Sequence, residues 1–351
     1  GIVRDKLGRK MSKSLGNSPD PLELIANYGA DGVRMGMLLS APAGNDILYD
    51  DKLCEQGRNF CNKIWNAFRL VKGWEVKDNI EQPADAAEAI KWFGQKLNAT
   101  VAELDDLFSK FRLSEALMVV YRLFWDEFSS WYLEMVKPAY QQPIDSATYK
   151  ATLSYFDSLL RLLHPFMPFI TEELWQHLEE RKDGESIMYA PMPSAGEIDT
   201  TVLDNMEVAK EIINGVRGVR AAKQISPREA LTLNVVSKDF MVPDADVVKK
   251  LANLEAINNV DSSDPAAALF MVGTIEYNVP LTQSIDVEAE RARIEKDINY
   301  YEGFLASVLK KLSNERFVSN APAAVVEGER RKQADAESRL KSLRANLEAL
   351  K

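Results

Sequence analysis

The chain has 351 residues, of which 46% are hydrophobic, and a formal net charge of −10; such a length suits two or three globular domains. No run approaches the roughly 20 apolar residues of a membrane helix, and the polar, basic start lacks the apolar core of a secretory signal. We therefore expect a cytoplasmic protein without a membrane partner.

The two cysteines, Cys54 and Cys61, fall on one predicted helix, two turns apart. That separation is too long for a disulfide. The only histidines, His164 and His177, are far away in the sequence and do not complete a zinc site. We interpret both cysteines as reduced packing residues and predict no metal site.

A basic loop lies near the start of the chain. Its residues are Lys10, Met11, Ser12, Lys13 and Ser14, followed by Gly16 and Asn17. Lysine binds phosphate as a point charge, and Ser, Gly and Asn favour turns. The loop therefore suits an anionic ligand, and the alternative is a solvated turn that binds nothing.

Two short helices are predicted after this loop. Asp20 and Pro21 suit the start of the first, which would run over 22–28 and stop at Gly29. Asp31 would cap the second. Together they would give the basic loop a compact base.

Five amphipathic helices then predict an antiparallel bundle. Their expected bounds are about 51–73, 84–109, 114–137, 146–163 and 168–178, with Ser114 capping the third. Trp65 falls on the face of the first helix that is predicted to be apolar, and the fifth helix is expected to run through Phe169. The opposite face of the first helix is polar and carries Arg58, Asn62, Lys63, Asn66 and Arg69. Such side chains donate to phosphates and bases, although a solvent face that touches nothing has the same composition.

The pattern changes after a linker at 188–194. A basic helix at about 202–223 carries Arg217 and Arg220, and a second helix is expected at 246–254. Alternation at 231–236 and apolar runs at 269–272 and 275–279 predict strands. This segment is therefore expected to form a small α/β subdomain.

The last segment predicts a helical hairpin. Apolar residues from Val287 to Leu312 and from Val326 to Leu350 recur in steps of four and three, the spacing of a coiled coil, with Glu329 as a polar interruption. Residues 314–322 form the predicted turn. A dimerisation coiled coil is the alternative, but a chain that folds back on itself needs no partner, so we expect an intramolecular arm and a monomer. Basic residues cluster on both helices: Lys310, Lys311, Arg330 and Arg331.

Several of these segments resemble class Ia aminoacyl-tRNA synthetases. The residues Lys10 to Ser14 spell KMSKS, the loop typical of class I synthetases. RNFCNKIWN at 58–66 and HPFMPFITEELW at 164–175 resemble the opening and closing helices of their anticodon-binding bundle. The terminal coiled coil with the turn NERFVSNAP is similar to the valine-specific members. Isoleucine-specific members, and a non-catalytic tRNA-binding or coiled-coil scaffold, are the alternatives.

The resemblance implies a mainly α fold in four parts. These are a KMSKS loop and stem-contact segment (1–50), an antiparallel helical anticodon-binding bundle (51–190), a basic helix with a small α/β subdomain (191–285), and a C-terminal antiparallel coiled-coil arm that binds tRNA (286–351).

The resemblance also implies a function. The intact enzyme would activate valine with ATP and Mg²⁺ and attach it to tRNA(Val). Lys10 and Lys13 would be catalytic, and residues 10–14 would bind the ATP phosphates. The implied tRNA-binding residues are Arg58, Asn62, Lys63, Asn66, Arg69, Arg217, Arg220, Lys310, Lys311, Arg330 and Arg331.

No histidine motif, dinucleotide fold, valine pocket or editing domain is recognisable in the sequence, which begins with Gly1. We therefore expect a C-terminal fragment that is inactive alone in aminoacylation and retains neither ATP nor Mg²⁺. ATP and valine would reach it through the missing N-terminal domains.

Overall fold

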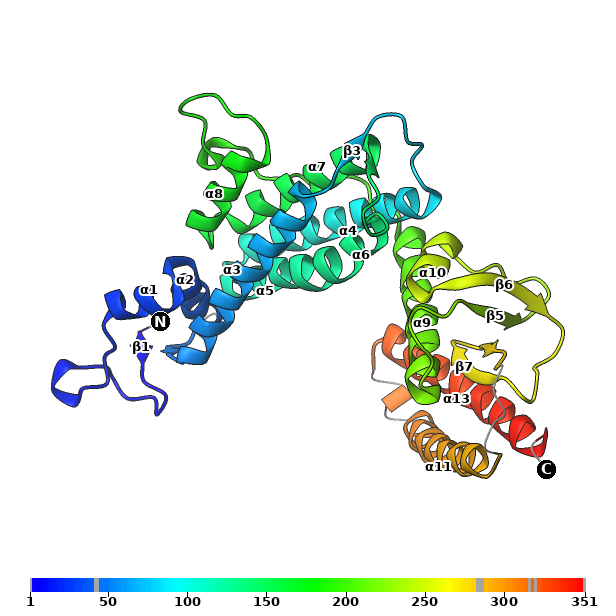
Figure 1. Cartoon of the computed structure of the whole chain (residues 1–351). Coiled ribbons are helices and arrows are strands. Elements are labelled where there is room, and N and C mark those ends of the chain that lie inside the picture. Colours follow the sequence, from blue (N-terminus) through cyan, green and yellow to red (C-terminus); the bar gives the residue numbers. More distant parts are fainter. Residues whose placement is uncertain (1, 41–43, 282–286, 315–316, 319–320, 350–351) are drawn as a thin grey trace. The chain divides into compact units, whose positions relative to one another are not determined.

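The computed structural model describes residues 2–40, 44–281, 287–314, 317–318 and 321–349. The chain divides into two compact units, Gly1–Asp204 and Asn205–Lys351, and each is mainly helical (Figure 1). None of the described helices is long and apolar enough to cross a bilayer.

The chain begins with a small platform. Strand β1 (Val3–Arg4) pairs in parallel with β2 (Ile47–Leu48), and helices α1 (Pro21–Tyr28) and α2 (Ala30–Leu39) lie between them in sequence. Asp20 caps α1 as predicted, by accepting from the Leu22 N–H at 2.9 Å. The prediction that Asp31 caps α2 was wrong, because Gly29 occupies the N-cap position and Asp31 is buried.

Glycines bring α2 against α3 (Asp51–Lys72). A Cβ on Gly57 would lie 2.5 Å from the carbonyl oxygen of Gly32, and one on Gly36 would lie 2.7 Å from the backbone nitrogen of Cys54. Any side chain at these positions would force the helices apart. The platform is therefore joined closely to the first helix of the bundle.

The bundle keeps most of the predicted helices. The third predicted helix differs, because it contains a ten-residue π-helix and begins at Leu113, so Ser114 does not cap it. Wider π-helical turns stack residues four to five apart, and Phe124, Phe128 and Tyr132 are all buried in this stretch. The helices are α3, α4 (Ala84–Ser109), α5 (Leu113–Arg122), the π-helix (Leu123–Tyr132), α6 (Leu133–Val136), α7 (Ser146–Leu163) and α8 (Pro168–Leu178).

One large side chain predicted to lie on the apolar face of the bundle is exposed: Trp65 on α3 is 42% exposed. Phe169 on α8, to which no face was assigned, is 63% exposed. The core is instead closed by other aromatic rings. Phe128 lies 5.3 Å from Phe93 and 5.5 Å from Phe156, measured between ring centroids. A short parallel pair, β3 (Val76–Lys77) with β4 (Ile144–Asp145), joins the loops at one end.

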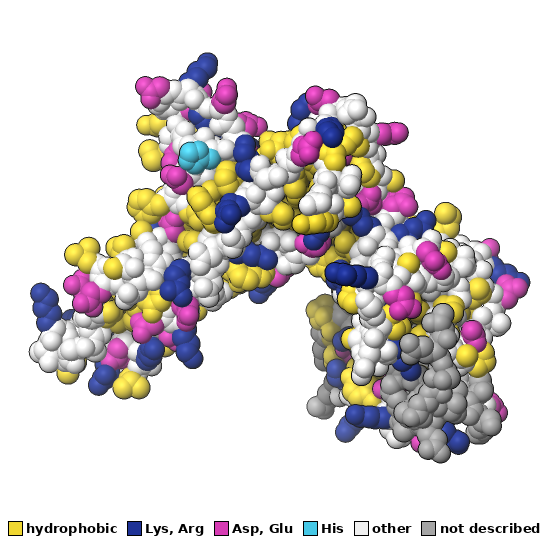
Figure 2. Space-filling model, in the orientation of Figure 1, with side chains coloured by type: hydrophobic (Ala, Val, Ile, Leu, Met, Phe, Trp, Pro, Cys, Tyr) yellow, Lys and Arg dark blue, Asp and Glu magenta, His cyan; other side chains and the backbone are white. Residues whose placement is uncertain are grey.

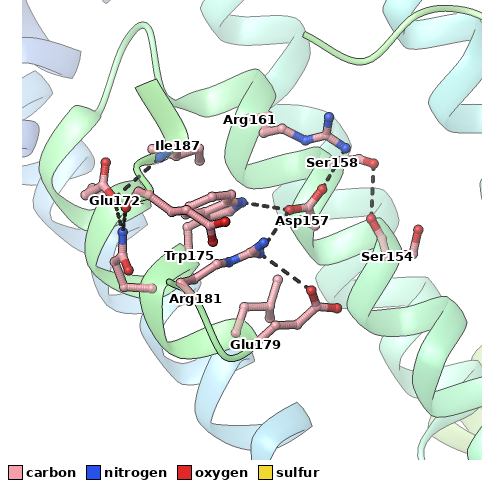
Figure 3. A network of polar contacts seen from close by, with 12 residues as sticks. Ser154, Asp157, Ser158, Arg161, Glu172, Trp175, Glu179, Arg181 and Ile187 are labelled. Carbon is pink, nitrogen blue, oxygen red and sulfur yellow. Dashed lines mark hydrogen bonds and ion pairs between the residues drawn. The ribbon is translucent and has the colours of Figure 1, made fainter. Parts of the chain in front are cut away.

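A polar network fixes the chain that follows α8 (Figure 3). Asp157 on α7 accepts from the Trp175 indole at 2.7 Å and pairs with Arg161 at 2.6 Å. The Arg181 guanidinium lies 3.6 Å from the centroid of the Trp175 ring, a cation–π contact. Arg161 also donates to the Pro191 carbonyl oxygen at 2.9 Å. The linker after α8 is thus tied to α7.

Helix α9 (Thr200–Lys223) leads into the second unit, where a four-stranded sheet has the order β6-β5-β8-β7. The predicted strands are present, but β6 was missed, because the sequence was interpreted as helix up to Leu254. Asn253 has φ = 52°, a left-handed conformation that ends α10 and turns the chain into β6. The elements are β5 (Leu231–Val236), α10 (Ala245–Ala252), β6 (Leu254–Val260), β7 (Ala268–Val272) and β8 (Ile275–Val279).

The final two helices, α11 (Val287–Leu312) and α13 (Ala323–Ala349), pack against each other, as predicted for an intramolecular arm. Their seam buries Ile294, Val308, Val326 and Leu340. The side chains of Val287 and Leu350, and residues 315–316 and 319–320 of the predicted turn, lie outside the described residues. Arg339 on α13 donates to the Tyr301 hydroxyl at 2.6 Å and to the Met271 carbonyl of β7 at 3.4 Å.

Candidate functional site

The KMSKS loop is framed by Asp5, which sequence analysis did not single out. Its carboxylate accepts from the backbone N–H groups of Leu7 and Arg9, at 3.0 and 2.8 Å, and from the Arg9 guanidinium at 2.7 Å. Hydrogen bonds from Asn17 and Arg9 outweigh the effect of burial and lower the pKa of Asp5 to about 2. The carboxylate is therefore ionised at neutral pH.

Asn17 closes the other side of the loop. Its Nδ2 donates to Asp5 at 3.0 Å and to the Lys10 carbonyl at 3.3 Å, while its Oδ1 accepts from the Ser12 N–H at 2.9 Å. A contact across 12 residues leaves no periodic pattern in the sequence. The only local indication was the spacing Asp5 to Gly8, typical of a turn, and the Gly8 N–H does donate to the Asp5 carbonyl at 2.9 Å.

Within the loop, Ser12 braces the backbone. Its Oγ accepts from the Leu15 N–H at 3.2 Å and lies 3.1 Å from the Ser14 Oγ, capping a short 3₁₀ helix (Lys13–Leu15). Gly16 follows with φ = 63°, and its N–H donates to the Lys13 carbonyl at 3.2 Å. A left-handed residue is needed to end this turn, which explains the glycine.

The side chains of the loop point to two environments. Met11 packs on the platform core formed by Leu24, Tyr49 and Cys54. Lys10 and Lys13 are exposed, and among the described residues neither ammonium group has an ion-pair partner. Met11 therefore fixes the loop to the platform, while the exposed Lys10 and Lys13 are available to bind phosphate oxygens.

On α3, four of the five predicted residues form one exposed strip, which we call the α3 strip: Arg58, Asn62, Asn66 and Arg69. They are spaced by four, four and three residues, so they lie on one side of the helix. The face of the molecule in Figure 2 shows Lys and Arg side chains interspersed with Asp and Glu. Any anion binding here therefore depends on placement and not on a broad positive field.

Lys63 does not belong to the α3 strip. It follows Asn62 by one residue, which places it about 100° further around the helix. The side chain is half-buried, and its ammonium lies 5.2 Å from the centroid of the Trp125 ring. Its role in this structure is a cation–π contact between α3 and the π-helix.

Helix α2 joins the platform to α8 through two charged residues that sequence analysis did not select as functional. Asp31 accepts from the backbone N–H groups of Phe169 and Ile170, at 3.3 and 2.7 Å. Arg34 donates to the carbonyl oxygens of Pro165 and Phe166, at 3.2 and 3.0 Å. The KMSKS platform is thereby attached to both sides of the α8 start.

In the second unit, the two predicted arginines of α9 differ. Arg220 is buried and donates to the carbonyl oxygens of Ser226, Ala252 and Asn253 at 2.8, 2.9 and 3.0 Å. Burial lowers the pKa of its guanidinium. Arg217 is exposed and donates to the Leu251 carbonyl at 3.4 Å. Arg220 is thus a structural residue that holds α9 against the α10–β6 turn.

The predicted basic residues of the arm also differ in their contacts. Lys311 pairs with Glu329 at 3.4 Å, and Lys332 pairs with the same carboxylate at 2.7 Å. The hydrogen bond from Lys332 and the nearby Lys311 charge lower the pKa of Glu329. Lys311 is itself exposed, as are the other three predicted residues: Lys310, Arg330 and Arg331.

Three family models match separate parts of the chain. Residues 1–50 match tRNA synthetases class I (I, L, M and V), residues 91–236 match the anticodon-binding domain of tRNA ligase, and residues 286–351 match the valyl tRNA synthetase tRNA binding arm.

Curated relatives match along the whole chain. The valine–tRNA ligase of Parabacteroides distasonis is 63% identical over 350 residues, and that of Bacteroides fragilis is 62% identical over 352, each covering 100% of this chain. The enzyme of Fusobacterium nucleatum is 38% identical over 368 residues and covers 99% of it.

The chain is similar to valine–tRNA ligases along its whole length. It spans 40% of the length of the Parabacteroides and Bacteroides valine–tRNA ligases. A solved ternary complex of Agrobacterium radiobacter K84 agnB2 LeuRS, tRNA and LeuAMS covers 58% of this chain with 23% identity and a TM-score of 0.41, too low a likeness to bear on function. Among the residues that the structure describes, no group of three His, Cys, Asp or Glu is placed to hold a metal ion.

Proposed function

We propose that the chain is the KMSKS-containing, tRNA-binding part of a valine–tRNA ligase, which activates valine with ATP and attaches it to tRNA(Val). The observation that carries this proposal is the order of the three family matches along one chain that is 63% identical to a valine–tRNA ligase throughout. We further propose that it is a cytoplasmic monomer.

The four parts have distinct roles in this proposal. Residues 1–50 present the KMSKS loop and contact the tRNA stem, 51–190 bind the anticodon arm, 191–285 connect, and 286–351 form the second tRNA-binding arm. The α2–α8 attachment supports joint movement of the first two parts, since Asp31 and Arg34 each make two hydrogen bonds across it.

Lys10 and Lys13 are the proposed catalytic residues. Negative charge develops on the triphosphate of ATP as its α-phosphorus is attacked, and two ammonium groups stabilise that charge electrostatically. The loop fits this task because both cations are exposed while Ser12, Gly16 and Asn17 hold the backbone. Mg²⁺ would neutralise phosphate charge in the intact enzyme, and we assign no ligand for it on this chain.

Fewer residues are proposed to contact tRNA than the sequence analysis predicted. The α3 strip, Arg217, and the exposed arm residues Lys310, Arg330 and Arg331 keep this role. Lys63, Arg220 and Lys311 are held by internal contacts with Trp125, three backbone carbonyls and Glu329, respectively.

A chimera tests the proposal. This chain would replace the matching 40% of the Parabacteroides distasonis valine–tRNA ligase. We expect valine-dependent ATP–pyrophosphate exchange and charging of tRNA(Val), and a Lys13→Ala version should lose most of the exchange rate. A folded chimera that charges another amino acid, or none, would refute the proposal. We expect no exchange from the 351-residue chain alone.

A further inference from the structure

An open groove lies where α2, α3 and α8 meet. Its volume is about 500 Å³, within the size range of small-ligand pockets. The helix break at Gly29 forms one wall, with Tyr28 and Arg58 beside it and Cys61 further along α3; Phe169 and Ile170 of α8 form the other wall. The groove is therefore lined by two aromatic rings, one guanidinium, two carboxylates and the chain around Gly29.

Phe169 is unusual among the side chains of this groove. It is 63% exposed, although the residue three positions before it, Phe166, is 3% exposed. Its backbone N–H is held by Asp31 at 3.3 Å, which fixes where α8 starts. The ring is thus presented on a rigid helix end and has an open face, as a stacking platform requires.

The opposite wall adds a cation and a second ring. The Arg58 guanidinium lies 5.8 Å from the centroid of the Tyr28 ring and donates to the Asn27 carbonyl at 3.4 Å. Planar guanidinium groups stack on bases and also bind phosphates. The groove can therefore hold a flat aromatic ligand that carries a neighbouring negative charge.

The carboxylates around the groove are already engaged. Asp31 is buried and bonded to two N–H groups of α8. Glu173 lies 3.3 Å from the His177 ring, and Glu55 pairs with Arg58 at 3.6 Å. The N–H groups on Asp31 and the Arg58 charge beside Glu55 reduce the repulsion that an incoming phosphate would meet, whereas Glu173 is exposed and its neighbour His177 is a cation only when protonated.

The groove continues into the α3 strip, because Arg58 belongs to both. From Arg58, the strip runs through Asn62 and Asn66 to Arg69 along one side of α3. We propose that one unpaired nucleobase of a bound RNA stacks on Phe169 in this groove while the adjoining phosphates follow the α3 strip. This inference rests on the proposed function, because it takes tRNA as the partner.

The test measures binding of a tRNA(Val) transcript to the 351-residue chain across a salt series. Phe169→Ala should weaken binding roughly 5- to 150-fold, the range for loss of one stacked base, and should leave the salt slope unchanged because no charge is lost. Phe169→Trp should retain binding. Tyr140→Ala is the matched control, since Tyr140 is an aromatic residue 89% exposed in the turn between α6 and β4, and it should bind like the wild type.

A second variant tests the path of the phosphates. Arg69→Gln should lower the magnitude of the salt slope by about 1, the effect of losing one phosphate contact. Ultraviolet crosslinking followed by peptide mapping should place the crosslinked nucleotide on the α8 peptide that contains Phe169.

The outcomes separate the two proposals. If the wild type binds tRNA and Phe169→Ala binds equally well, the groove does not hold a base and only this inference fails. If the wild type does not bind tRNA at any salt concentration, the proposed function fails together with it. Equal losses in Phe169→Ala and Phe169→Trp would also overturn stacking as the mode of contact.

Discussion

The carboxylate of Asp31 in α2 accepts a 2.7 Å hydrogen bond from the backbone N–H of Ile170 in α8, 139 residues further along the chain. The first N–H groups of a helix lack partners within the helix, and here a side chain from a different helix supplies one. Arg34, one turn later on α2, holds the carbonyls immediately before α8. Two charged residues of α2 therefore connect the KMSKS platform to the bundle. Asp31 binds the first N–H groups of α8, and Arg34 binds the carbonyl oxygens of the residues just before it.

Removing this carboxylate should destabilise the first unit. Burial raises the pKa of Asp31, against the effect of the two N–H donors and Arg34, so the site depends on those bonds. We expect Asp31→Ala to lower the free energy of unfolding by about 1–3 kcal/mol, because two part-buried N–H groups at the start of α8 lose their acceptor. Urea denaturation of the chain measures it. Asp183→Asn, at an exposed loop aspartate, is the control and should change stability by less than about 0.5 kcal/mol.

The loop frame should depend on pH through Asp5. Because the pKa of Asp5 is lowered to about 2, from an ordinary value near 4, its contribution to stability is complete above about pH 4 and is lost as the pH falls towards 2. NMR titration should show the Leu7 and Arg9 amides, which donate to Asp5, shifting with a midpoint near pH 2. A midpoint near pH 4 would mean that these bonds do not persist in solution.

The two arginines of α9 should separate stability from RNA binding. Arg220→Ala removes three hydrogen bonds made by a buried guanidinium and should cost about 2–4 kcal/mol of stability in the second unit. Arg217→Ala should cost much less, and it should weaken tRNA binding in the folded chain. Thermal unfolding and filter binding measure the two effects. If a fully folded Arg220→Ala chain lost affinity for tRNA, Arg220 would contact the tRNA directly and the structural role assigned to it would be wrong.

Glu329 should reduce the positive charge that the arm presents to RNA, because it pairs with Lys311 and Lys332. A leucine at this seam position replaces a buried ionic group by a packed apolar one, which is often stabilising, so Glu329→Leu should raise the melting temperature. It also releases Lys311 and Lys332, now paired at 3.4 and 2.7 Å. We therefore expect tighter tRNA binding at low salt and a steeper salt dependence. Unchanged salt dependence would show that these lysines do not approach the RNA.

Local patterns in the sequence were sufficient for most of the helices. Apolar periodicity and flanking breakers gave the bounds of α4 and α7 as the structure has them. The π-helix and β6 were missed, because one depends on aromatic packing in three dimensions and the other on a single left-handed Asn253. The sequence also contained no indication that Phe169 is exposed, since the start of α8 is set by the distant Asp31.

The candidate site could be predicted only where its residues are consecutive in the sequence. Residues 10–14 are recognisable as a basic loop from the sequence itself. The contact between Asp5 and Asn17, which holds the loop, follows from no spacing rule. Residue type also could not distinguish an exposed arginine such as Arg69 from a buried one such as Arg220. That distinction comes from which backbone carbonyls lie within reach.

Titration of the 351-residue chain with tRNA(Val), at low and high salt and with a changed anticodon, tests the central claim most directly. The proposal predicts binding that weakens as salt rises, because phosphate contacts release counterions, and that is lost when the anticodon is changed. Equal affinity for tRNA(Val), for the changed tRNA and for unrelated RNA would contradict it and leave only a basic scaffold.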